Sequence, residues 1–76
     1  MSWIIRVTAL KDQWGNSIKK GETFTLVQSS SQPSSDELKK MLTKMGRKVT
    51  SYSGLPTMSD KEQVKEMNGW LVEKIK

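Results

Sequence analysis

The first part of the chain alternates apolar and polar residues, a pattern typical of β-strands with one buried face. In residues 22–28, Phe24 and Leu26 alternate with threonines. In residues 3–10, the positions of one face are all apolar: Trp3, Ile5, Val7 and Ala9. β-Branched and aromatic residues suit a pleated, partly buried surface. We therefore expect two strands that form a hairpin, with residues 11–21 as a long basic tip.

The tip of this hairpin carries turn signals at two places, Gly15–Asn16 and Lys20–Gly21. Its one aliphatic side chain is Ile18. We expect this side chain to fold back beneath the tip, because burying it removes apolar surface from water.

A helix is predicted after a serine-rich segment. Residues 29–35 have almost no apolar side chain whose burial would offset the entropy of ordering them, so we expect a flexible loop. Ser34 and Glu37 have the spacing of a capping box, which starts a helix. One apolar stripe at helical spacing follows: Leu38, Met41, Leu42 and Met45. Gly46 is suited to end the helix in a left-handed conformation.

The C-terminal part is less regular. Residues 47–53 fit either a short edge strand or an extended connection. Ser59 and Glu62 form a second capping box and predict a helix of about two turns, which Asn68–Gly69 would end. Residues 70–75 are predicted to form a strand that pairs with the N-terminal hairpin.

These elements predict one α+β domain over residues 1–76, in the order β-β-α-(β)-α-β. The N-terminal hairpin and the C-terminal strand would form a small antiparallel sheet, with one or two helices packed on one face. So short a chain holds one thin core, so a second copy could cover an exposed edge as a homodimer. Trp3 and Trp70 lie in predicted strands and are assigned to the core.

The composition argues against an enzyme. The chain has no cysteine and no histidine, the usual zinc ligands and the usual groups for nucleophilic and acid-base catalysis. Its clustered carboxylates, Asp36–Glu37 and Asp60–Glu62, fall in predicted first helical turns, where the helix dipole favours negative charge. Glycine-rich phosphate loops are absent from the sequence. We therefore expect a non-enzymatic protein without metal, cofactor or small-molecule substrate.

The N-terminus lacks the pattern of a signal peptide, and no apolar run approaches 18 residues. The expected location is cytoplasmic, with no membrane contact.

The net charge of +5 suggests a partner, because the positive excess is concentrated around residues 34–58. Lys40, Lys44 and Arg47 lie opposite the apolar stripe of the predicted helix and would form a cationic ridge. Lys19 and Lys20 at the hairpin tip would add a second contact. Such a surface predicts binding to nucleic-acid phosphates, and the alternative interpretation is a solvated helix face that keeps the domain soluble.

Trp14 supports a second hypothesis. An exposed tryptophan in the hairpin tip could anchor a protein interface, together with a sheet edge. The alternative interpretation is that Trp14 folds back as the lid of a small core, since tryptophan is highly buried on average. The sequence thus predicts a binding module whose partner is nucleic acid or another protein.

Overall fold

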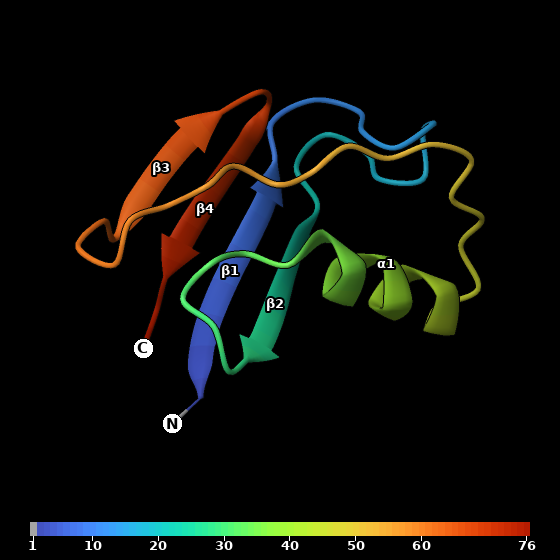
Figure 1. Cartoon of the computed structure of the whole chain (residues 1–76). Coiled ribbons are helices and arrows are strands. Elements are labelled where there is room, and N and C mark those ends of the chain that lie inside the picture. The colour runs from blue at the N-terminus through green and yellow to red at the C-terminus, as the bar shows by residue number, and fades with distance from the viewer. Residues whose placement is uncertain (1) are drawn as a thin grey trace.

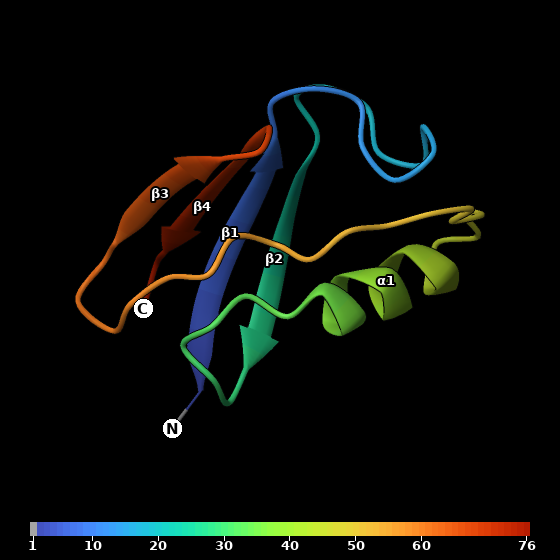
Figure 2. The same cartoon turned by 45° about the horizontal axis from the view of Figure 1, so that its top comes forward.

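The computed structural model describes residues 2–76 and shows a four-stranded antiparallel sheet with one helix. The elements in chain order are β1 (Trp3–Ala9), β2 (Thr23–Gln28), α1 (Ser35–Lys44), β3 (Val64–Met67) and β4 (Trp70–Lys74). The strands lie in the order β2-β1-β4-β3. Helix α1 and the long connection that follows it lie on one side of the sheet (Figure 1; Figure 2).

The predicted hairpin and C-terminal strand are confirmed. Strand β1 pairs antiparallel with both β2 and β4, so Val7 lies opposite Phe24 on one side and Val72 on the other. Of the predicted inner face of β1, Ile5, Val7 and Ala9 are buried, whereas Trp3 is only partly buried and packs against the core. The central position of β1 follows from its composition, since it is the longest apolar strand and needs cover on both edges.

A β-bulge ends the pairing of β1 with β2. The Gly21 N–H donates to the Ala9 carbonyl at 2.7 Å, and the Ala9 N–H donates to the Glu22 carbonyl at 2.9 Å. Two residues therefore oppose one, and Gly21 takes the left-handed φ of +91° that this bulge requires. The bulge turns the chain away from the sheet into the hairpin tip.

Helix α1 begins and ends as its sequence predicts. The Glu37 N–H donates to Ser34 Oγ at 3.3 Å, which is one half of the expected capping box. At the other end, the Gly46 N–H donates to the Thr43 carbonyl and the Arg47 N–H to the Leu42 carbonyl, both at 3.0 Å. This is a Schellman motif, with Gly46 in the left-handed region at φ +81°.

The prediction of a second helix after Ser59 was wrong, because residues 64–67 form β3 instead. The Ser59 N–H does bond the Glu62 carboxylate at 2.8 Å, but this contact closes a turn. Asn68 and Gly69, with φ of +55° and +79°, make the two-residue connection between β3 and β4. Both angles are positive, as a tight hairpin turn requires, so Asn-Gly at this position is a hairpin signal.

Residues 45–63 form no strand, so of the two expectations for residues 47–53 the extended connection holds. Hydrogen bonds tie this connection to the serine-rich segment. The Met58 N–H donates to Gln32 Oε1 at 2.8 Å, and the Leu55 N–H donates to Ser35 Oγ at 2.7 Å. The flexibility predicted for residues 29–35 stays a prediction.

The core lies between the sheet and the layer formed by α1, the hairpin tip and the connection. Its fully buried members come from all of these parts: Ile5, Val7, Ile18, Leu26, Leu38, Leu42, Met58, Trp70 and Val72. Ile18 folds beneath the tip as predicted. Within the described part of the chain, residues 2–76, no such layer covers the opposite face of the sheet, and Val27 on that face is 65 % exposed. An antiparallel sheet commonly leaves one face in water.

Candidate nucleic-acid interface

Arg47 joins the hairpin tip to the end of α1. Its Nη1 donates to Glu22 Oε2 at 2.5 Å and its Nη2 donates to Glu22 Oε1 at 2.7 Å, which is a bidentate pair. Nη1 also donates to the Ser17 carbonyl at 2.9 Å. A further hydrogen bond runs from Ser17 Oγ to the Lys48 carbonyl. The tip and the residues after the helix are therefore held side by side by four hydrogen bonds.

This arrangement stabilises the charge on Glu22. Its pKa falls from 4.5 to about 2, first because Arg47 donates to the carboxylate and next because the Lys19 N–H donates to it at 3.0 Å. The same pair raises the pKa of Arg47 above its ordinary value. Both groups are charged at neutral pH, where the pair holds the two segments together.

Arg47 therefore does not form part of a free cationic ridge, which corrects one element of the sequence-based hypothesis. Its side chain is only 28 % exposed, its fork is occupied by Glu22, and its guanidinium carbon lies 5.6 Å from the centre of the Phe24 ring. The sequence shows the charge of Arg47 but not the direction of its side chain. Arg47 follows the helix-ending Gly46, so the chain changes direction before the arginine side chain is placed.

The lysines of the hypothesis remain at the surface. Lys40 lies 3.8 Å from Glu37 and Lys19 lies 4.0 Å from Asp12, which are long, exposed ion pairs. Pairs of this kind contribute little and exchange readily with other anions. Lys44 is exposed in the last turn of α1, and Lys20 is exposed at the tip.

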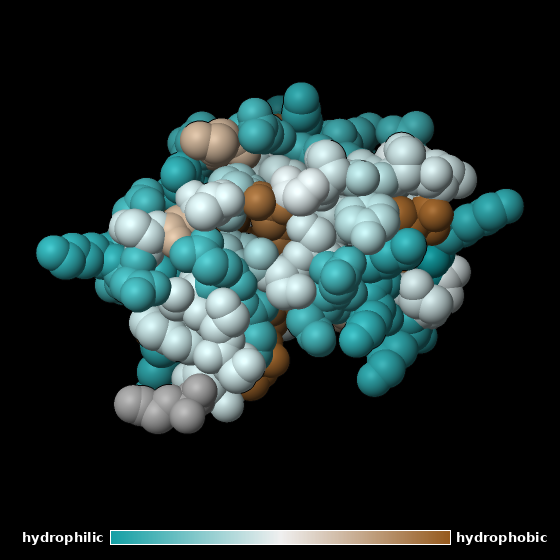
Figure 3. Space-filling model, in the orientation of Figure 1, coloured by the Kyte–Doolittle hydropathy of each residue, from teal (hydrophilic) through white to brown (hydrophobic). Residues whose placement is uncertain are grey.

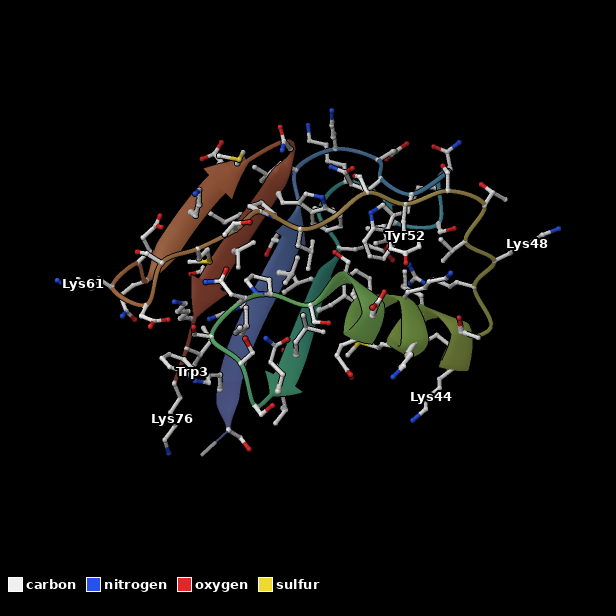
Figure 4. All side chains as sticks on the ribbon, in the orientation of Figure 1. Trp3, Lys44, Lys48, Tyr52, Lys61 and Lys76 are labelled. Carbon is white, nitrogen blue, oxygen red and sulfur yellow. The ribbon has the colours of Figure 1, made fainter. Side chains whose placement is uncertain are left out.

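The clamp brings the lysines of two distant segments to one end of the molecule. We call this surface the basic end; its members are Lys19, Lys20, Lys40, Lys44 and Lys48. Residues 10–53 carry eight cations and four carboxylates, a net charge of +4 out of the total of +5. In the space-filling view, hydrophilic side chains project from the part of the molecule that contains α1 (Figure 3). Lys44 and Lys48 lie at that end, and Lys61 and Lys76 lie at the opposite one (Figure 4).

Trp14 belongs to the core and not to the surface. It is only 4 % exposed, and its ring packs against Trp70 at a centroid distance of 5.7 Å and against Tyr52 at 5.1 Å. A protein interface anchored by Trp14 would require an exposed side chain. The burial of Trp14 instead supports the alternative interpretation, in which it folds back as the lid of the core. Its placement costs stability, because the φ of Trp14 is +54° and its buried Nε1 has no hydrogen-bond partner among residues 2–76.

Tyr52 is the exposed aromatic residue that sequence reasoning missed. It is 41 % exposed, its hydroxyl donates to Asp36 Oδ1 at 3.1 Å, and the Lys39 ammonium lies 4.7 Å from the centre of its ring. The hydrogen bond to Asp36 raises the pKa of Tyr52, so the hydroxyl stays protonated. The sequence offered no clear signal, because Tyr52 stands in a segment without periodicity.

Comparison with known protein families, with curated proteins and with solved structures gives no match. Among residues 2–76, no cluster of three or more carboxylate side chains is placed to hold a metal ion. Within the same residues, α1 is too short and too polar to cross a membrane.

Proposed function

We propose that this protein is a non-enzymatic binding module that contacts nucleic-acid phosphates through the basic end. The supporting observation is the clamp of Arg47 on Glu22 and Ser17, which joins the lysines of the hairpin tip to those of α1. Five exposed lysine side chains on the segments that the clamp joins create a field that attracts a polyanion without a sequence preference. Arg47 has a positioning role in this proposal, and the lysines make the contacts.

The proposal implies a defined dependence on salt. Each lysine that neutralises a phosphate releases counterions, so the logarithm of the affinity falls linearly with the logarithm of salt concentration. If three or four of the lysines contact phosphates, the slope is about −2 to −4. A solvated helix face with no ligand gives no such binding.

Fluorescence anisotropy with labelled oligonucleotides at several salt concentrations tests the proposal. The double variants Lys44→Gln/Lys48→Gln and Lys19→Gln/Lys20→Gln should weaken binding and each reduce the slope by about one or two. Lys61→Gln/Lys76→Gln is the matched control, because it removes the same charge at the opposite end of the molecule (Figure 4). Binding that is insensitive to salt, or that falls equally in the control, contradicts the proposal.

A second candidate function is self-association through the outer edge of β2. Strand β2 contains no charged residue, whereas the other edge strand, β3, carries Lys65 and Glu66. Charged residues commonly protect edges from pairing with other chains, so β2 is the less protected edge. Sedimentation equilibrium tests this candidate: a dimer that Thr25→Lys converts to a monomer supports it, and a monomer at all concentrations excludes it.

A further inference from the structure

The surface around Tyr52 combines an aromatic ring with cations. The Lys39 ammonium lies over the ring at 4.7 Å from its centre, and the segment of Tyr52 leads directly from Arg47 and Lys48. Of the large apolar and aromatic side chains exposed among residues 2–76, Tyr52 is the one with an aromatic ring. Aromatic rings beside a cationic surface are the arrangement by which proteins hold unpaired bases.

The ring is held in place before any ligand binds. Trp14 supports it from the core at 5.1 Å, and the hydroxyl is fixed by Asp36. Trp14 is buried and Lys39 is exposed, so the ring contacts the core through one neighbour and the surface through the other, and Tyr52 is itself 41 % exposed. A platform whose orientation is already fixed loses little conformational entropy on binding.

The other aromatic–lysine pair is not suited to the same role. Lys74 Nζ lies 5.2 Å from the centre of the Trp3 ring, but it is committed to the Ser59 carbonyl at 2.6 Å and Lys74 is buried. Trp3 also lies at the end of the molecule opposite Lys44 and Lys48 (Figure 4). Tyr52 is therefore the platform that the basic end can use.

The charges of α1 argue against insertion of this helix into duplex DNA. Recognition helices present their N-terminal residues to the bases in the major groove. In α1 that turn carries Asp36 and Glu37, which repel the phosphates on both sides of the groove. The lysines of α1 lie further along the helix, where they can follow a flexible strand.

We propose, as an extension of the function proposed above, that the ligand is single-stranded nucleic acid and that Tyr52 stacks on one of its bases. The Lys39 ammonium leaves the ring and pairs with a phosphate, and the base takes its place over the ring. A cation–π contact at the surface is weaker than a base–aromatic stack, so the exchange favours binding. The lysines of the basic end hold the adjacent phosphates.

The first test compares one short oligonucleotide sequence as single-stranded DNA, single-stranded RNA and duplex DNA, by fluorescence anisotropy. Wild-type protein should prefer a single strand, and Tyr52→Ala should weaken that binding about 5- to 100-fold. Tyr52→Phe keeps the aromatic face and should bind within about twofold of wild type. Circular dichroism of each variant checks that the fold is intact, and Lys61→Gln is the control for charge.

The second test uses the wild-type protein and so does not depend on the stability of a variant. The chain contains a single tyrosine, whose ring signals in an NMR spectrum are therefore unambiguous. Stacking on a base should shift these signals upfield as a single strand is added. Two results overturn the inference while leaving the proposed function in place: salt-sensitive binding without a shift of the tyrosine signals, or a preference for duplex. If no nucleic acid binds at low salt, the proposed function fails and this inference fails with it.

Discussion

Replacement of Gly15 by alanine is a sharp test of how the hairpin tip is packed. Gly15 has φ of +65° and lies between two further left-handed residues, Trp14 and Asn16. A β-carbon at this position would overlap Thr50 Oγ1 and would lie 3.4 Å from the Thr50 β-carbon. Gly46 is the matched control, because it has φ of +81° but no atom of the described residues lies within 4 Å of an added β-carbon.

The magnitude follows from two separate contributions. A left-handed conformation costs an alanine about 1–2 kcal/mol, and this applies to Gly15→Ala and Gly46→Ala alike. In Gly15→Ala the Thr50 side chain must also move, at about 0.5–1.5 kcal/mol if its χ1 is pushed about 30° off its rotamer. Both variants gain the same small benefit from a less flexible unfolded chain. We therefore expect Gly15→Ala to lose about 1 kcal/mol more than Gly46→Ala.

Urea denaturation followed by tryptophan fluorescence measures these differences, and a double-mutant cycle isolates the overlap. Thr50→Ala removes the hydroxyl that the new methyl group would meet. In the Gly15→Ala background it should recover about 1 kcal/mol, whereas in the Gly46→Ala background it should recover nothing. Equal effects of Thr50→Ala in both backgrounds would refute the close packing of the tip on residues 50–51.

Two further predictions follow from the interior of the same region. Trp14→Ala should destabilise the protein by about 3–5 kcal/mol, because it empties the space between Tyr52 and Trp70. Thermal denaturation measures this loss, and a variant with an unchanged melting temperature would contradict the burial of Trp14. Glu22 has a lowered pKa of about 2, so its charge stabilises the fold above about pH 4.5 and this contribution is lost as the pH falls towards 2. Urea denaturation between pH 7 and pH 2.5 should show a decline that is smaller in Glu22→Gln; equal declines contradict the clamp.

The sequence by itself determined the parts of the fold that depend on local patterns. Alternation in residues 3–9 and the stripe that includes Leu38 and Leu42 identify the buried faces, because these periods match the geometry of a strand and a helix. Met45, the last member of the predicted stripe, is 53 % exposed, because α1 ends before it. Ser34 and Gly46 mark the ends of α1, since capping involves only neighbouring residues.

Local patterns failed where the same residue spacing fits both a helix start and a turn. Ser59 and Glu62 have the spacing of a capping box, yet the following residues find their partners in β4. The pairing of β3 with β4 across Asn68–Gly69 decides the outcome, because strand partners override the weak preference of a short helix.

Only the tertiary structure decided the composition of the candidate site. The clamp of Arg47 on Glu22 joins residues 25 positions apart in the chain, and Trp14 is buried by Trp70, which is further away still. No periodicity encodes such contacts. The charge and the spacing of the lysines could be read from the sequence, but which cations stay free and which aromatic ring stays exposed depends on how distant segments pack.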